Sequence, residues 1–315
     1  MKIHPVKDSL VISNDNEVAA LPNDNMAQAP TATPNQNLSC PPGSPLFTED
    51  TLEVGTVALT APRQDDGWLW PAVEAGASLA TSAVVGSTKW YHGYQVSGLE
   101  NIPKTGPVLL VLNHSLATYD VLLLATEIAE KTGRTPRPIV DRLFFKVPGV
   151  SHLATKAGLV EASRENARAL LNDGELVIVL PGGMKEAIKP STEKYEFQWD
   201  TRKGFVRMAL ETGATMVMGA CPAADDIYTV YGNPITRAAY DYLRLPAPVF
   251  AGRYYTGIPM AAKLSHVLSK PVPMPRLPEN KHLTASFIDG KHRQILKVMD
   301  NTVTHALVNK TDKNS

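Results

Sequence analysis

Apolar and polar positions form a repeating pattern of short apolar runs and longer amphipathic stretches from residue 94 onward. Short apolar runs bounded by turn residues are typical of buried strands, and apolar residues at helical spacing are typical of helices that cover a sheet. Strands are predicted over 94–98, 107–113, 138–140, 159–161, 175–180, 215–219 and 283–287. Helices are predicted over 120–131, 143–158, 163–171, 203–211, 257–268 and 292–308. This alternation predicts an α/β fold, with a mostly parallel sheet flanked by helices.

The same pattern divides the chain into three parts. Residues 1–62 are rich in Asn, Pro, Ala, Thr and Asp and lack periodicity, which predicts a disordered tail. Residues 63–92 contain WLWPAVEAGASLATSAVVGSTKWY, whose aromatic ends and mildly apolar middle suit an amphipathic helix. That helix either lies on a membrane surface or packs on the folded domain, which is predicted over 93–310.

Composition argues against several classes of protein. The 315 residues include 31 Lys and Arg and 31 Asp and Glu, so a nucleic-acid partner is not expected. Cys40 and Cys221 lack the spacing of a metal or redox motif, so no metal is expected. The sequence has neither an uninterrupted apolar run of membrane-spanning length nor a signal-peptide pattern, so a spanning helix and secretion are not expected.

His114 and Asp120 are the first candidate catalytic residues. They flank a polar loop between a predicted strand and a predicted helix, and the carboxyl end of a strand is a common place for chemistry in α/β folds. In the functional interpretation, Asp120 orients His114, and His114 removes a proton from an acceptor hydroxyl. In the alternative interpretation, His114 is a structural histidine and Asp120 is a helix N-cap.

A second candidate element is the loop PGGMKE, which follows the predicted strand 175–180. Its paired glycines, Gly182 and Gly183, can leave backbone N–H groups free for an anion or oxyanion, although a plain turn uses Gly-Gly equally well. Lys185 either binds a phosphate or is solvated, and Glu186 either fixes the loop or is solvated.

Three more positively charged side chains lie at the starts of predicted helices. The helix dipole disfavours a positive charge at Arg164, so either an anion binds there or Arg164 pairs with Glu161 or Glu165. Arg202 and Lys203 are either a second cationic contact or a solvated helix end.

Several aromatic residues either line an apolar groove or, as the safer interpretation, pack in the core. They are Phe144, Phe145, Tyr195, Phe197 and Trp199. The sequence contains no G-x-S-x-G, H-E-x-x-H, Walker or G-x-G-x-x-G motif, so no resident cofactor is expected.

Taken in order, four motifs resemble the blocks of the PlsC-like glycerolipid acyltransferase superfamily. They are NHSLATYD at 113–120, GLVEASR at 158–164, PGGMKE at 181–186 and YEFQWDTRKGFVRMALETGA at 195–214. PGGxxE and RKGFxRxA are most similar to the branch of the type 2 diacylglycerol acyltransferases, the transmembrane protein 68 relatives and the plant phytyl ester synthases. The resemblance covers residues 90–290 and implies the PlsC-like acyltransferase fold.

The resemblance also implies roles for single residues. It makes His114 the catalytic base and Asp120 its orienting partner, and it places a second block at Gly158 and Arg164. The acceptor-side loop is then formed by Pro181, Gly182, Gly183 and Glu186.

Two departures from the broad superfamily pattern change the expected acceptor. Five residues instead of four separate His114 from Asp120, which puts Tyr119 at the usual Asp position, and LPGGMK at 180–185 replaces F-P-E-G-T-R. Both departures resemble the neutral-lipid branch. They shift the expected acceptor from lysophosphatidate toward a mono- or diacylglycerol or a long-chain alcohol.

The expected function is transfer of a fatty acyl group from acyl-CoA or acyl carrier protein to a lipid hydroxyl, with diacylglycerol as the example acceptor, by His–Asp general-base catalysis. The alternatives are acylation of a lysophospholipid, which would need Arg164 and Lys185, and non-catalytic lipid binding. The expected partners are the acyl donor, the lipid acceptor and a membrane surface. Attachment is expected to be peripheral, on a cytoplasmic-side membrane.

Overall fold

A computed structural model describes residues 82–141, 159–199, 201–232, 248–277 and 284–312. All described residues belong to the unit Asp65–Ser315. The predicted tail 1–62 and the predicted helix 143–158 therefore lie outside the described residues.

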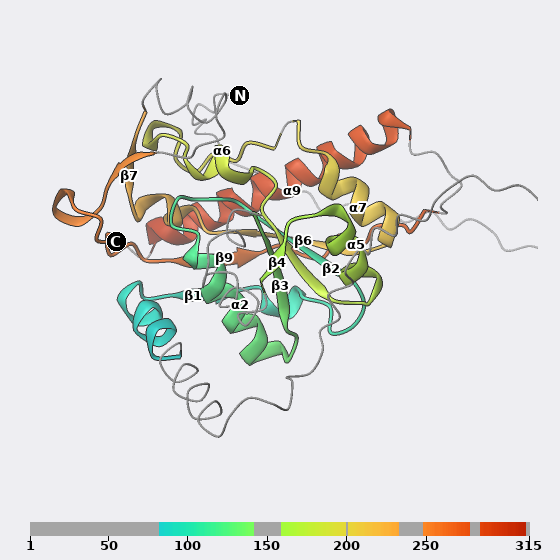
Figure 1. Ribbon diagram of the computed structural model, residues 1–315, viewed down its shortest axis with the longest axis horizontal. Coiled ribbons are helices and arrows are strands. Elements are labelled where there is room, and N and C mark those ends of the chain that lie inside the picture. Colours follow the sequence, from blue (N-terminus) through green and yellow to red (C-terminus); the bar gives the residue numbers. More distant parts are fainter. Residues whose placement is uncertain (1–81, 142–158, 200, 233–247, 278–283, 313–315) are drawn as a thin grey trace, which may run out of the picture. The chain divides into compact units, whose positions relative to one another are not determined.

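A seven-stranded sheet in the order β1-β9-β6-β2-β5-β3-β4 forms the centre of this unit (Figure 1). Its strands are β1 (Gln95–Ser97), β2 (Val108–Leu112), β3 (Pro136–Val140), β4 (Val160–Glu161), β5 (Leu176–Val179), β6 (Thr215–Ala220) and β9 (Ser265–Leu268). All neighbouring strands are parallel except β6 and β9, which are antiparallel. A separate antiparallel pair consists of β7 (Thr229–Tyr231) and β8 (Val249–Ala251). The predicted mostly parallel sheet is thus confirmed.

The central strand β2 explains why the core has two halves. All five of its residues are buried because β5 and β6 pair with its edges and helices cover both of its faces. Since side chains alternate along a strand, Leu109 and Val111 belong to one apolar cluster, and Val108, Leu110 and Leu112 belong to another.

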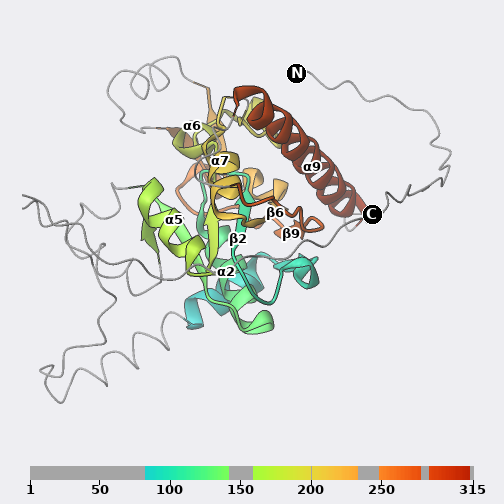
Figure 2. The same cartoon turned by 90° about the vertical axis from the view of Figure 1, so that its right-hand side faces the viewer.

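Helices cover both faces of the sheet, as Figures 1 and 2 show. The helix α2 (Tyr119–Thr132) packs on the β2 face that carries Leu110, through Val121, Leu124 and Ile128. The opposite face is covered by α5 (Arg164–Asn172), α7 (Gly204–Thr212) and α9 (Ala285–Asp312). The predicted helices 120–131, 163–171 and 203–211 are therefore confirmed to within one residue at each end.

Three element predictions were wrong. Residues 257–268 do not form a helix. Instead the 3₁₀ turn η4 (Arg253–Tyr255) is followed by an irregular segment with bends at 256–258 and then by β9, which forms because it pairs with both β1 and β6. The segment 283–287 is not a strand, since Thr284 caps the N-terminus of α9 and its Oγ1 accepts a hydrogen bond from the Phe287 amide. The predicted loop after β5 contains the short helix α6 (Gly183–Ala187).

The described part of the segment expected at the membrane surface is helical over 82–91. Among the described residues, no helix has both the length and the apolar content needed to span a bilayer.

Candidate active site

The candidate site lies where the three neighbouring strands β2, β5 and β6 end. The loop 113–118 follows β2, the segment with α6 follows β5, and the turn η3 (Pro222–Asp226) begins just after β6. Since these strands are parallel, their carboxyl ends meet at one edge of the sheet, which is the usual position of a site in this class of fold.

The buried carboxylate of Glu186 joins two of these segments. Its Oε1 accepts a hydrogen bond from the His114 amide at 2.6 Å, and its Oε2 accepts one from the Gln198 amide at 2.8 Å. Burial raises the pKa of the Glu186 carboxyl, while both amide hydrogen bonds and the charge of Lys189 act in the opposite direction. Glu186 is therefore not solvated, and it holds the backbone at His114 in the loop after β2 rather than its own loop.

Lys189 holds the backbone carbonyl of the same residue, His114. Its ammonium group is almost fully buried and donates hydrogen bonds to the His114 carbonyl oxygen at 3.0 Å and to Asp225 Oδ1 at 2.9 Å. Asp225 in turn accepts a hydrogen bond from the Tyr195 amide through Oδ2 at 2.8 Å. Both backbone polar groups of His114 are thus fixed by buried charged side chains.

Sequence reasoning missed Lys189 and Asp225. Neither residue belongs to a recognisable short motif, and Asp225 is separated from Lys189 by 36 residues. No local pattern marked them, because Lys189 stands among charged and polar residues in KEAIKPSTEK, where a solvated lysine is expected.

The His114 ring is a neutral base, and its Nε2 makes no hydrogen bond with the residues that the structure describes. Its Nδ1 lies 3.0 Å from the Ser115 carbonyl oxygen, and because a carbonyl only accepts, we assign the ring proton to Nδ1 and the lone pair to Nε2. Burial lowers the pKa of His114 to about 4, so the ring is uncharged near pH 7. This is the protonation state that a general base needs.

Asp120 has a different partner from the one expected. Among the described residues it makes no hydrogen bond with His114. Its Oδ2 instead lies 3.5 Å from Nε2 of His266 in β9. Burial raises the pKa of Asp120 to about 7. The tautomer of His114, which the sequence assigned to Asp120, is set in this structure by the Ser115 carbonyl.

The other predicted residues are distributed around the site. Pro181 and Gly182 precede α6, and Gly183 has a left-handed backbone with φ of 55°. The Gly183 amide donates to the Leu180 carbonyl at 3.0 Å, so it is not available to an oxyanion in this structure. The side chain of Lys185 is exposed.

The remaining cations lie on α5 and at the start of α7. Arg164 and Arg202 are exposed, and Lys203 pairs with Asp289 of α9 at 2.7 Å. Arg164 lines a small hollow with residues of α7 such as Met208. The structure does not bring these three cations into contact with His114.

The predicted aromatic residues also separate into groups. Trp199 is fully buried and packs in the core with Phe197 and Phe205, as the safer interpretation expected. Tyr195 donates a hydrogen bond through its hydroxyl to Asp226. Phe144 and Phe145 lie outside the described residues.

An apolar groove of about 580 Å³ lies beside the start of α2. Its walls come from the helix 82–91, through Val84 and Trp90, and from α2, through Tyr119 and Leu122. Tyr119 is the first residue of α2, directly after the loop that carries His114. Sequence reasoning missed this groove because its walls come from segments far apart in the chain.

The chain belongs to the diacylglycerol acyltransferase family, whose pattern matches residues 114–306. It is 31% identical over 214 residues to the human "DGAT1/2-independent enzyme synthesizing storage lipids", covering 65% of this chain and 63% of that protein. The bovine protein of the same name is 31% identical over 185 residues, covering 58% of this chain and 53% of that one. The chain thus spans between half and two thirds of these relatives.

Among solved structures, the 1-acyl-sn-glycerophosphate acyltransferase PlsC from Thermotoga maritima is similar. The match has 18% identity and a TM-score of 0.39, and it covers 72% of this chain and 81% of that chain.

The contact between Gly182 and Glu186 gives a first prediction. A Cβ at position 182 would lie 1.9 Å from Glu186 Oε2. In Gly182→Ala the carboxylate must therefore move away, and it loses its hydrogen bonds from the amides of His114 and Gln198. At about 1–3 kcal/mol for each of the two amides left unpaired, we expect a loss of about 2–6 kcal/mol in the free energy of unfolding, measured by urea titration.

Gly183→Ala is the matched control. A Cβ there meets no atom within 4 Å, and only its φ of 55° is unfavourable, so a loss of about 1–2 kcal/mol is expected. Equal losses in the two variants would contradict the role of Glu186.

Proposed function

We propose that this protein transfers a fatty acyl group from an acyl thioester, either acyl-CoA or acyl carrier protein, to the hydroxyl of a neutral glycerolipid such as diacylglycerol. The observation that carries the proposal is the neutral His114, with Nε2 free, in a chain of the diacylglycerol acyltransferase family. The relatives named for synthesizing storage lipids support a neutral acceptor.

In the proposed reaction, His114 Nε2 accepts the proton of the acceptor hydroxyl while the hydroxyl oxygen attacks the thioester carbonyl. The new carbon–oxygen bond forms, the carbon–sulfur bond breaks, and the leaving thiolate takes the proton from the imidazolium. The transfer is direct, without an acyl-enzyme, and the acyl donor is a co-substrate. Glu186 and Lys189 act as positioning residues, because each binds the backbone of His114 and neither touches the reacting atoms.

We assign the acyl chain to the groove between the helix 82–91 and α2. Its apolar walls suit a hydrocarbon chain, and its volume of about 580 Å³ is in the range of small-molecule sites. Tyr119 connects the groove to the loop that carries His114, so a chain lying in the groove can direct its carbonyl end toward this loop.

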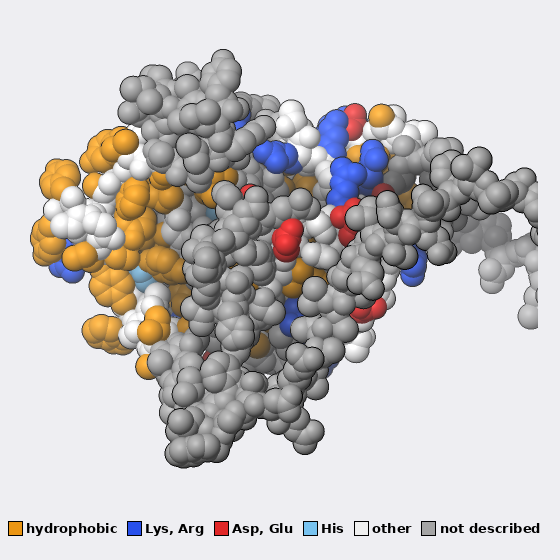
Figure 3. Space-filling view, viewed as in Figure 1, with side chains coloured by type: hydrophobic (Ala, Val, Ile, Leu, Met, Phe, Trp, Pro, Cys, Tyr) orange, Lys and Arg blue, Asp and Glu red, His pale blue; other side chains and the backbone are white. Residues whose placement is uncertain are grey.

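We further propose peripheral attachment to a membrane surface. Figure 3 shows apolar side chains gathered on the side of the molecule that carries β7 and the turn after β8. Tyr254 and Tyr255 in this turn are 76% and 89% exposed, and Trp90 of the helix 82–91 is 84% exposed. Tyr and Trp are enriched at membrane interfaces because their rings combine an apolar body with a polar group. Exposed aromatic side chains of this kind support contact with lipid.

His114→Ala tests the proposed base directly. Removal of a general base lowers the rate by about 10²–10⁴-fold, and we expect this loss in transfer of labelled oleoyl groups from oleoyl-CoA to diacylglycerol. The assay panel also includes monoacylglycerol, a fatty alcohol and lysophosphatidate, and His305→Ala on the exposed face of α9 is the control variant. Unchanged activity in His114→Ala would contradict the mechanism, and product on lysophosphatidate alone would replace the neutral acceptor by a phospholipid precursor.

The pKa of His114 predicts the acid limb of the activity. A base works in its neutral form, so activity is present above the pKa and lost as pH falls through it. Because burial lowers this pKa from the ordinary 6.5 to about 4, we expect kcat/KM to stay level from pH 8 to about 5 and to fall only below that. Circular dichroism at each pH separates loss of activity from unfolding. A midpoint near 6.5 in folded protein would contradict a buried neutral base.

The membrane proposal predicts a loss of binding in the double variant Tyr254→Ser and Tyr255→Ser. Since about 1.4 kcal/mol corresponds to tenfold in affinity, loss of two aromatic contacts is expected to weaken sedimentation with phosphatidylcholine vesicles by about tenfold or more. Phe287→Ser, an exposed aromatic on α9 outside this turn, is the control and is expected to bind like the unmodified protein. Equal binding by all three proteins would contradict attachment through the turn.

A further inference from the structure

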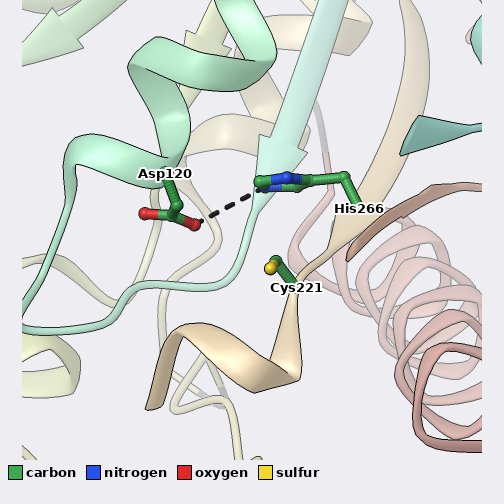
Figure 4. Close-up of side chains that lie close together, drawn as sticks. All are labelled: Asp120, Cys221 and His266. Carbon is green, nitrogen blue, oxygen red and sulfur yellow. Dashed lines mark ion pairs between the residues drawn. The ribbon is translucent and has the colours of Figure 1, made fainter. Parts of the chain in front are cut away.

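Three buried side chains that could ligate a metal ion converge beside the candidate site, as Figure 4 shows. Asp120 comes from the first turn of α2, Cys221 from the residue between β6 and η3, and His266 from β9. One donor atom from each, a carboxylate oxygen, the thiol sulfur and an imidazole nitrogen, lies within 4.8 Å of the other two. All three residues are almost inaccessible to solvent.

The distance between Asp120 Oδ2 and His266 Nε2 fits two ligands of one metal ion better than a direct hydrogen bond. Asp120 Oδ2 and His266 Nε2 are 3.5 Å apart, which is longer than the usual range of about 2.7–3.2 Å for a hydrogen bond of this kind. Two ligands each about 2.0–2.1 Å from a tetrahedral zinc ion lie about 3.3–3.4 Å from each other.

The groups around the cluster also suit a metal site. The Tyr94 hydroxyl lies 3.0 Å from His266 Nδ1, and such a contact orients a ligating imidazole with Nε2 toward the ion. A cation at the centre would stabilise the thiolate and the carboxylate together.

We propose that Asp120, Cys221 and His266 bind a divalent transition-metal ion of the zinc type. A thiolate, an imidazole and a carboxylate together are a ligand set that zinc accepts. The ion would link the start of α2, the end of β6 and β9, which surround the loop that carries His114. This role is structural and does not depend on the proposed acyl transfer.

No pattern in the sequence indicates such a site, because each ligand comes from a different element. Positions 120, 221 and 266 have no motif spacing, and the expectation of no metal had considered only the spacing of Cys40 and Cys221.

Cobalt substitution tests the proposal in a chain with one cysteine. In Cys40→Ser the only remaining cysteine is Cys221, so a thiolate-to-cobalt charge-transfer band in the near ultraviolet would report Cys221 as a ligand. The protein is expressed with zinc or cobalt in the medium, because the buried site takes up its ion during folding. We expect about one equivalent of metal by elemental analysis, together with this band.

Substitution of single ligands then identifies the site. Cys221→Ala and His266→Ala are expected to lose the retained metal, and Tyr94→Phe is expected to lower metal affinity by about 10–100-fold. His92→Ala removes another buried histidine outside the cluster and is the matched control, with metal retained. With free zinc about 100-fold above Kd, the melting temperature should rise by about 5–10 °C in Cys40→Ser but not in Cys221→Ala.

Two results would overturn the proposal. One is folded Cys40→Ser that retains neither zinc nor cobalt, and the other is bound cobalt without the thiolate band. If the ligand variants fail to fold, Cys40→Ser alone still shows whether Cys221 binds the metal. Because both readouts are independent of acyl transfer, they stay informative if the proposed function fails.

Discussion

The organisation of the site depends on one buried carboxylate. Glu186 accepts hydrogen bonds from two backbone amides, one in the loop after β2 and one in the segment before α7. It therefore connects two chain segments that are not joined by strand pairing. Only a carboxylate does this without a mismatch, because an amide side chain would present an N–H group to one of two N–H donors. The requirement extends to Gly182, since any side chain there would occupy the space of the Glu186 carboxylate.

From this carboxylate, charged contacts extend to the last helix, and they change from buried at Lys189 and Asp225 to partly exposed at Asp226. Lys189 links the His114 carbonyl to Asp225 in η3, and the neighbouring Asp226 accepts hydrogen bonds from Lys194 and Lys310, the latter near the end of α9. Buried ion pairs of this kind add little net stability, because desolvation opposes the attraction between the charges. Their contribution here is positional. Glu186 and Lys189 hold the N–H and C=O groups of His114, and the contacts of Asp226 connect η3 to the end of α9.

The sequence predicted those elements whose signal is local. The fully apolar β2 and the helices α2, α5 and α7 were found because burial on both faces or on one stripe leaves a pattern in consecutive residues. β9 was missed because its extended form depends on β1 and β6, whose positions no local pattern reveals. The contacts of His114 were missed for the same reason. Glu186, which was a candidate site residue, and Lys189, which was not, lie 72 and 75 residues away from it.

The one extra residue between His114 and Asp120 accounts for the orientation of Asp120. Successive residues of a helix are rotated by about 100°, so moving the carboxylate one position further into α2 turns it away from the direction that Tyr119 takes. Tyr119 faces the groove and bonds His92, whereas Asp120 faces β9 and His266. Since one carboxylate cannot orient both histidines, the proton on His114 is held by the Ser115 carbonyl, which requires no second side chain. The same rotation places Asp120 beside Cys221 and forms the buried cluster.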